Sequence, residues 1–376
     1  MPADRFLAEI HERRPHVRSG DDPARFESLL TLAELDRTIA ELDLRAGMVE
    51  LANARNPIDR SEYVKGEYID RVALAQAYRR GATVIFNQLQ HSDGRMADFC
   101  RRLERVFSCH IQTNTYLTPP AEQGFRTHFD THDVFILQIA GSKDWRLYDN
   151  PEQSPFRGER FRGLQQPPGE PALSFTLNTG DCAYIPRGFY HDASNTGDTP
   201  SLHITVGLIV RTWADLMLEA VSEVCLAEPE FRRALPPGYV HPSADRAAMD
   251  ATFARLTRTL ADAVRMDGAL DTLIETFVRS REPDMTGALL GNRIEPEATY
   301  AARPSPLRIT QEQDEVRVLA PGCTFRFGRA PLSLIERVLN GEPFSPADLN
   351  HDEAMDTVGR LMTAGLVARL PDPATG

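Results

Sequence analysis

The chain has 376 residues, of which 41% are hydrophobic and 26% are charged. This ordinary globular composition excludes wholesale disorder, and the length indicates two or three domains. The formal net charge of −12 argues against nucleic-acid binding, and it fits either simple solubility or a basic protein or peptide as partner.

The chain also shows no sign of membrane insertion or export. No apolar run reaches the roughly 18 to 20 residues that span a bilayer, so no membrane association is expected. The polar first residues contain no apolar segment of a secretion signal, which predicts a cytoplasmic protein. The five cysteines form no CxxC pair, which argues against a zinc knuckle and a disulfide framework. They are Cys100, Cys109, Cys182, Cys225 and Cys323.

Residues 1–70 are predicted to form an N-terminal helical extension. Leu32, Leu35 and Ile39 recur there at helical spacing and would share one face of a helix. Pro57 prevents a helix from continuing through its neighbourhood.

Residues 71–210 are predicted to form a β-rich domain. A helix that ends at Gly81 is followed by the strand TVIFNQL and the helix RMADFCRRLERVF. Short runs of β-branched and aromatic residues come next, separated by Gly, Pro, Asn and Asp: HIQTNTYL, DVFILQIAG, DWRLYD, LSFTLN, CAYIPR and LHITVGLIV. Short strands at this spacing indicate a jelly-roll or barrel rather than a doubly wound parallel sheet.

After the β-rich domain the pattern becomes helical again over residues 211–295. Residues 296–376 then read as a small module of helices and strands, in which Met355, Val358 and Leu361 recur at helical spacing. The predicted fold class of the whole chain is therefore α+β.

The segment FRTHFDTHD contains the residues that indicate a metal site. In a strand, His128 and Asp130 would project from the same face, because residues two apart in a strand point the same way. One imidazole and one carboxylate are two of the three ligands of a facial triad, and a second histidine would be brought in by folding. His191 is the best candidate, since it follows a strand and a Pro-Arg-Gly turn in GDCAYIPRGFYHDA.

Two other histidines are alternatives for the third ligand. His132 is in phase with Asp130, but a ligand so close along the chain would strain the geometry. His203, in SLHITV, is expected to face the barrel interior. Two histidines and one carboxylate on one face of an octahedral iron leave three positions open, of which a 2-oxoacid takes two and dioxygen the third.

Three stretches of this region resemble the JmjC-type cupin proteins of the ribosomal oxygenase group. They are NTYLTPPAEQGFRTH, HFDTHDVFILQIAGSKDWRLY and GDCAYIPRGFYHDA with the following SLHITV. The resemblance is close over about residues 75 to 210 and looser to the end of the chain. It implies a JmjC double-stranded β-helix over 71–210, a helical dimerisation region over 211–295, and a winged-helix-like module over 296–376.

The resemblance also implies roles for individual residues. The iron(II) ligands fall on His128, Asp130 and His191, and the basic residue that grips the distal carboxylate of the co-substrate 2-oxoglutarate falls on Lys143. Asn114 and Tyr116 match positions that line the same pocket. A polar residue sometimes found late in the last strand of the barrel is replaced here by Gly207, which departs from the pattern of the group.

The predicted function is that of an iron(II)- and 2-oxoglutarate-dependent dioxygenase that hydroxylates a protein or peptide side chain. Arginine or histidine in a basic substrate such as a ribosomal protein is the favoured target, given the resemblance and the negative charge. Three alternatives are open: hydroxylation of a natural-product peptide, N-methyl-lysine demethylation, and a non-catalytic cupin that acts as a binding module. A homodimer is possible, and neither nucleic acid nor membrane is expected as partner.

Overall fold

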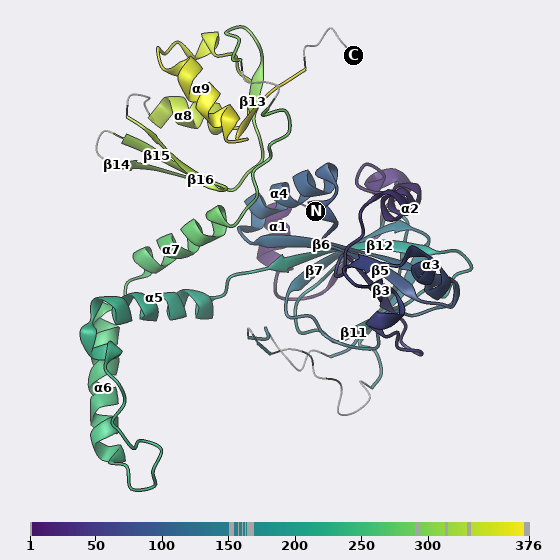
Figure 1. Ribbon diagram of the computed structural model, residues 1–376, viewed down its shortest axis with the longest axis horizontal. Helices are drawn as coiled ribbons and strands as arrows, with labels where there is room; N and C mark the ends of the chain where they lie inside the picture. The colour runs from purple at the N-terminus through teal and green to yellow at the C-terminus, as the bar shows by residue number, and fades with distance from the viewer. Residues whose placement is uncertain are drawn as a thin grey trace. The chain divides into compact units, whose positions relative to one another are not determined.

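The computed structural model describes residues 2–149, 154–156, 158–159, 161, 163, 169–289, 293–312, 315–328 and 332–371. The chain divides after Val210 into two compact units, unit 1 (residues 1–210) and unit 2 (residues 211–376). Unit 1 contains a seven-stranded sheet and a three-stranded sheet, both antiparallel, with helices against the larger one (Figure 1). The predicted α+β fold with a jelly-roll core is confirmed.

The strands of unit 1 are β1 (His16–Arg18), β2 (Val49–Ala52), β3 (Val64–Lys65), β4 (Tyr68–Ile69), β5 (Thr83–Asn87), β6 (His110–Thr118), β7 (Asp133–Ala140), β8 (Ser142–Leu147), β9 (Leu173–Asn178), β10 (Cys182–Ile185), β11 (His191–Ser194) and β12 (Ser201–Ile209). Its helices are α1 (Ala3–Glu9), α2 (Leu32–Glu41), α3 (Arg71–Arg79) and α4 (Gly94–Phe107), with short 3-10 turns at Pro23–Phe26, Arg60–Glu62 and Leu89–His91.

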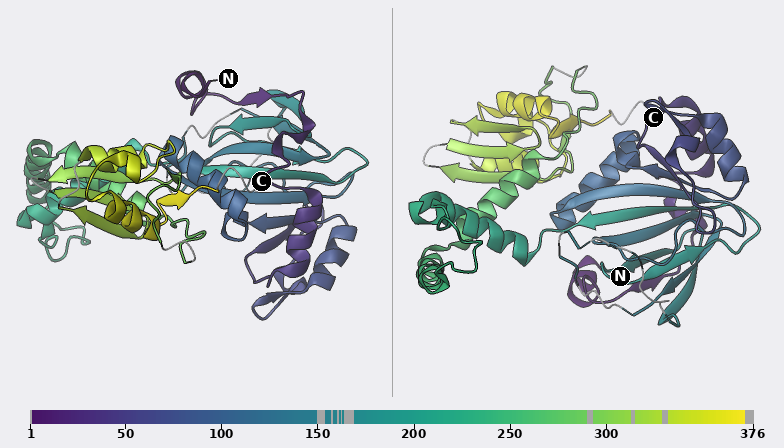
Figure 2. Two further views of the ribbon diagram at one scale, coloured as in Figure 1. Left: turned by 90° about the horizontal axis from the view of Figure 1, so that it is seen from above. Right: turned by 60° about the horizontal axis from the view of Figure 1, so that its bottom comes forward.

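The larger sheet has the strand order β1-β10-β7-β12-β6-β5-β2, and the smaller has the order β11-β8-β9. The strands of the larger sheet lie side by side in the right view of Figure 2. β12 is central, hydrogen-bonded to β7 on one side and β6 on the other. Its sequence SLHITVGLI is buried almost throughout, as expected for a strand that is covered on both faces.

The two faces of the larger sheet have different environments. Ile204 of β12 belongs to a hydrophobic core with Leu35 of α2, Leu74 of α3 and Met96 of α4, so helices cover that face. On the opposite face, Ile136 of β7 belongs to a second core that includes residues of the smaller sheet. Since side chains alternate along a strand, the neighbours of Ile204 on β12 point toward the smaller sheet. The space between the two sheets holds the candidate active site.

Residues 1–70 were predicted as a helical extension, but they supply both edges of the larger sheet. β1 pairs with β10, with His16 opposite Tyr184, and β2 pairs with β5, with Val49 opposite Phe86. The predicted stripe forms α2, although Leu32 stays 39% exposed. The edge strands have three and four residues, too short for periodicity to reveal them.

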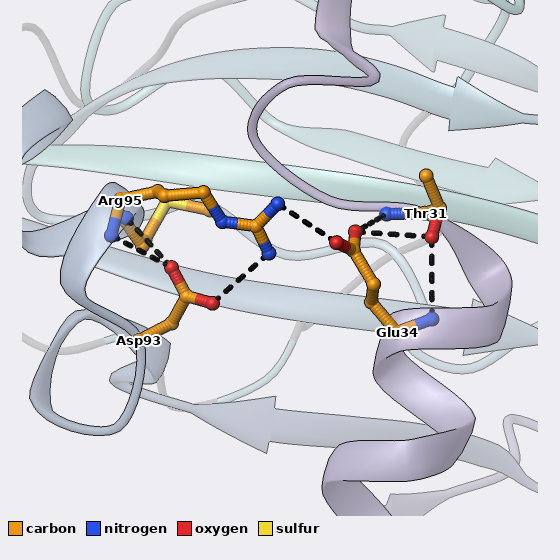
Figure 3. Close-up of polar contacts among 5 residues, drawn as sticks. Thr31, Glu34, Asp93 and Arg95 are labelled. Carbon is orange, nitrogen blue, oxygen red and sulfur yellow. Dashed lines mark hydrogen bonds and ion pairs between the residues drawn. The ribbon is translucent and has the colours of Figure 1, made fainter. Parts of the chain in front are cut away.

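The start of α2 is linked to the start of α4 (Figure 3). Thr31 and Glu34 form a capping box, in which the Thr31 hydroxyl accepts from the Glu34 amide and the Glu34 carboxylate accepts from the Thr31 amide. Asp93 caps α4 by accepting from the amides of Arg95 and Met96. The Arg95 guanidinium bonds to Glu34 at 2.7 Å and to Asp93 at 3.2 Å, which joins the two caps.

Unit 2 contains α5 (Trp213–Ala227), α6 (Arg246–Ala263), α7 (Met266–Arg279), α8 (Leu332–Leu339) and α9 (Ala354–Thr363), with 3-10 turns at Pro229–Arg232 and Ala347–Leu349. Its strands are β13 (Tyr300–Ala302), β14 (Arg308–Glu312), β15 (Glu315–Ala320), β16 (Cys323–Phe327) and β17 (Val367–Arg369). A three-stranded antiparallel sheet β14-β15-β16 shares one hydrophobic core with α8 and α9. In the described part of the chain, no helix has both the length and the apolar character that a membrane crossing requires.

Candidate active site

The candidate metal ligands lie on two short segments that meet at the edge of the smaller sheet. His191 is the first residue of β11 and follows shortly after the turn at Arg187 and Gly188, as predicted. The strand expected over His128 and Asp130 is wrong, because His128 makes only an isolated bridge and the residues between it and β7 belong to no strand. His128 makes one isolated antiparallel bridge to His191, with N···O distances of 3.0 and 2.8 Å. After His128 the chain turns away from β11 and continues into β7, so this segment pairs with β11 at a single bridge only.

The three predicted iron ligands come together nevertheless. One ligand atom from each of His128, Asp130 and His191 lies within 4.8 Å of the other two. Nε2 of His191 is 3.6 Å from Oδ2 of Asp130, and the two imidazole centroids are 4.6 Å apart. Nδ1 of His128 lies 2.9 Å from the carbonyl of Arg126, and Nδ1 of His191 lies 3.0 Å from the carbonyl of Phe189. An N–H at Nδ1 satisfies these carbonyls and leaves the Nε2 lone pairs free to bind a metal.

The protonation states of these groups suit a divalent cation. Burial, aided by His128, lowers the pKa of His191 to about 4, so this imidazole is neutral at physiological pH. Burial opposes ionisation of Asp130, but the neighbouring imidazoles outweigh it and hold the pKa of this carboxyl below its usual value. Two imidazoles and one carboxylate with open positions are the ligand set of non-haem iron(II) oxygenases. The residues therefore fit iron(II).

The alternative ligands, His132 and His203, lie outside this cluster. A Cβ built on Gly207 would lie 2.7 Å from Cδ2 of the His132 ring, so the absence of a side chain at Gly207 makes room for that ring. The departure from the group's pattern at Gly207 thus has a packing consequence. His203 faces the interior, as predicted, and is 3% exposed.

A small cavity of about 70 Å³ adjoins the ligands between the two sheets. β6 and β12 contribute Tyr116 and His203 to its wall, and β8 contributes Lys143 and Trp145. The rings of Tyr116 and His203 are stacked, with centroids 4.7 Å apart and planes at 1°. Burial, followed by the charge of Asp130, raises the pKa of Tyr116, which is therefore a neutral phenol. Trp145 is both buried and cavity-lining.

Lys143 is a buried cation in the wall of this cavity, with 4% of its surface exposed. Its Nζ donates to the Thr118 hydroxyl at 2.8 Å and lies 3.5 Å from Nδ1 of His203. No ion pair joins it to a carboxylate of the described residues. Burial lowers the pKa of Lys143 to about 7, because no anion compensates for its lost hydration. A cation of this kind is suited to an anionic guest such as the distal carboxylate of a 2-oxoacid.

The other predicted pocket residue, Asn114, is placed differently from Tyr116. Its Oδ1 accepts from the amide of Gln88 at 3.0 Å, so it supports the turn after β5. It is outside the cavity lining as far as the described residues define it. Trp145, in contrast, was missed as a cavity residue. Its position two residues from Lys143 is the signal that would have revealed it.

Comparisons with known proteins agree with the resemblance seen in the motifs. Residues 86–216 match the JmjC domain family. A Dictyostelium discoideum protein named bifunctional lysine-specific demethylase and histidyl-hydroxylase NO66 is 41% identical over 174 residues, which are 43% of this chain and 33% of that protein. A Gallus gallus protein named ribosomal oxygenase 1 is 30% identical over 298 residues, or 74% of this chain and 49% of that protein. The chain thus spans half or less of the length of these curated relatives.

Solved structures extend the similarity over the whole chain. The crystal structure of the Escherichia coli ribosomal oxygenase YcfD aligns with a TM-score of 0.58 and 16% identity, covering 98% of each chain. The structure of YcfD in complex with cobalt and 2-oxoglutarate aligns with a TM-score of 0.57 and 17% identity, covering 99% of each chain. At this level of identity the match establishes a shared fold.

Proposed function

From the premise that this chain carries a JmjC domain and has the fold of a ribosomal oxygenase, we propose that it is an iron(II)- and 2-oxoglutarate-dependent dioxygenase that hydroxylates a side chain of a protein or peptide. One observation carries the proposal. A two-histidine, one-carboxylate cluster and a buried, unpaired lysine open into the same cavity between the sheets. The cluster suits the metal, and the lysine suits the far end of the co-substrate.

Each group in the cavity has a defined task in this reaction. Iron(II) with 2-oxoglutarate and dioxygen supplies the oxidising chemistry that inserts one oxygen atom into a C–H bond and converts the 2-oxoacid to succinate and CO2. Lys143 binds the distal carboxylate, and Thr118 and His203 hold its Nζ in place. The stacked rings of Tyr116 and His203 form a rigid wall that keeps water away from the co-substrate.

Residues near the cavity favour the proposal that the substrate is a protein with a basic side chain. Phe125 lines the cavity, is 42% exposed and lies against the rings of His128 and Tyr116, so it lies where a side chain would enter. Glu50 on β2 lies in the cross-strand row that leads through Ile85 to Tyr116. Its carboxylate is exposed and, after burial and the charge of Asp130, adds to the raised pKa of Tyr116. An anionic group in the same cross-strand row as Tyr116 favours an arginine or histidine target.

Peptide turnover tests this function against its alternatives. The full chain with iron(II), ascorbate and 2-oxoglutarate is incubated with basic peptides from ribosomal proteins, and products are analysed by mass spectrometry. We expect succinate and a peptide mass increase of one oxygen atom. Loss of one methylene from a methyl-lysine peptide would instead establish demethylation, which is part of the name of the Dictyostelium relative. Absence of succinate with every peptide and with the co-substrate alone would leave a non-catalytic cupin.

We also propose that unit 2 forms a homodimer through its helical region. The helices α5, α6 and α7 expose large apolar side chains that a monomer would leave in water. Trp213 is 78% exposed, Leu226 71% and Phe253 70%. A second copy of this chain would bury these surfaces on both partners at once, as in an isologous interface.

Replacing Phe253 with glutamate is expected to dissociate this dimer, because it places a charge in an apolar interface. Light scattering after gel filtration should give about twice the 42.0 kDa chain mass for the wild type and the single-chain mass for the variant. Ala251→Glu is the matched control, since Ala251 is exposed on the other side of α6 and receives the same charge. A monomeric wild type, or equal dissociation by both variants, would contradict the proposal.

A further inference from the structure

A buried carboxylate lies directly behind the candidate metal ligands. Asp192, 3% exposed, accepts hydrogen bonds from three side chains. Its Oδ2 accepts from the Thr127 hydroxyl at 2.6 Å and from the Tyr148 hydroxyl at 2.9 Å. Its Oδ1 accepts from Nε of Arg146 at 2.7 Å and from the same guanidinium's second nitrogen at 2.6 Å. The charge of Asp192 is thereby compensated without any contribution from the metal site.

Asp192 and Thr127 are the chain neighbours of two metal ligands. Asp192 follows His191 on β11, and Thr127 precedes His128 on the segment that bridges to it. Adjacent side chains of a strand point to opposite faces, so Asp192 points away from the side on which His191 approaches Asp130. Thr127 meets Asp192 on that reverse side, where its hydroxyl donates to the carboxylate. Their hydrogen bond therefore joins the two ligand-bearing segments from behind.

The two segments differ in how firmly the sheet holds them. β11 is a regular strand of the smaller sheet, with Asp192 opposite Arg146 of β8. The segment that carries His128 belongs to no strand, and its backbone is fastened at the His128–His191 bridge and where Gly188 donates to the carbonyl of Asp130 at 2.9 Å. The bond from Thr127 to a charged, buried acceptor adds a strong side-chain link to these backbone contacts.

We propose that Thr127 is a positioning residue for the metal centre: its hydrogen bond to Asp192 fixes His128 relative to His191 and so sets the affinity for the metal. The inference rests on the proposed function only in taking the three-ligand cluster as a metal site. Partners outside the ligand set typically change metal affinity by about 10- to 100-fold when they are removed. Loss of this bond should act on metal binding more than on the fold.

The test compares two variants that each delete one hydroxyl donor to the same oxygen of Asp192. Thr127→Val removes the donor on the ligand segment, and Tyr148→Phe removes the donor that follows β8. Cobalt(II) is titrated into the full-length apoprotein and followed by calorimetry and visible absorption, and apoprotein melting is measured in parallel. We expect Thr127→Val to weaken cobalt binding by about tenfold or more. Tyr148→Phe should keep the wild-type affinity, and both apoproteins should melt at similar temperatures.

Every other outcome counts against the proposal. Equal cobalt affinity in the wild type and Thr127→Val would show that the bond does not position His128. Equal weakening in the two variants would show that Asp192 acts through general stability, and so would an apoprotein of Thr127→Val that fails to fold. Thr127→Ser, which keeps the hydroxyl, should bind cobalt like the wild type. Failure of the wild type itself to bind cobalt would refute the metal site and is seen before any variant is compared.

Discussion

Replacing His128 with alanine is expected to abolish turnover of 2-oxoglutarate, with a loss of more than about 100-fold, because even partners outside a ligand set cost 10- to 100-fold when removed. The substitution leaves the Asp130 and His191 side chains without the third ligand, and it also removes an imidazole that is held in place by the Arg126 carbonyl. Succinate release and equilibrium metal content measure the effect. Full succinate production by this variant would make the iron assignment wrong.

His132→Ala is the matched control for that experiment. His132 is the neighbouring histidine that spacing alone left open as a ligand, and its ring packs over Gly207 outside the three-residue cluster. This variant should keep one metal ion per chain. If instead His132→Ala lost the metal and His128→Ala kept it, the ligand assignment would have to be exchanged between the two histidines.

Replacing Lys143 with methionine is expected to raise the KM for 2-oxoglutarate by roughly 100-fold, which is about 2.8 kcal/mol at 1.4 kcal/mol per factor of ten. Methionine has a similar length, but it leaves the distal carboxylate of the co-substrate buried without a cation. Removing one partner of a buried charge pair costs about 2–5 kcal/mol, so the estimate is at the lower end. Initial rates at varied 2-oxoglutarate concentration, with the metal saturating, provide the measurement. An unchanged KM would exclude Lys143 from co-substrate binding.

The pH dependence of co-substrate binding gives a second, independent signature of Lys143. Burial lowers the pKa of the free amine to about 7. Below this pH the ammonium is already formed and binds the carboxylate directly. Above it, binding must also protonate the amine, so the affinity for 2-oxoglutarate should fall as pH rises from 7 to 8, by up to about tenfold per pH unit. Binding above pH 7 should therefore take up a proton, which calorimetry in buffers of different ionisation enthalpy detects.

Lys143→Arg separates charge from geometry in this titration. Arginine remains protonated throughout the range, so its affinity for 2-oxoglutarate should not depend on the pH between 7 and 8. Lys143→Met should bind weakly and with little pH dependence. The same decline with pH in all three proteins would place the titrating group elsewhere.

The three candidate ligands were predicted from the sequence to come together, and they do, but the strand that was expected to carry two of them is absent from this described part of the chain. His128 and Asp130 do face one centre, but they lie on a segment with a single bridge rather than on a strand. The spacing of residues predicts which side chains point in the same direction, but it does not predict where hydrogen bonding between two strands ends. His191 was predicted as a ligand because a typical strand sequence and a Pro-Arg-Gly turn precede it. These patterns lie within short stretches of the chain, so they can be recognised from the sequence alone.

The features that escaped prediction depend on contacts between distant segments. Thr118 supports Lys143 across the two sheets, and Asn114 holds the turn at Gln88 besides bonding to the side chain of Tyr116. Nothing in the spacing of Asn114 and Tyr116 distinguishes these two roles. The burial that shifts the pKa of Lys143 likewise arises only when β6 and β12 close over it.

The edges of the larger sheet have a consequence for how unit 1 folds. β1 and β2 come from the first residues of the unit, yet β1 pairs with β10, which lies near its end. Closing so long a stretch of chain costs entropy that is recovered only after the intervening strands are in register. We therefore expect β1 to dock late, after β7 and β10 have paired, and amide hydrogens of β10 facing β1 to exchange sooner than those facing β7. Until then, β10 is an open edge, where an unfolded neighbour could add a strand and start aggregation.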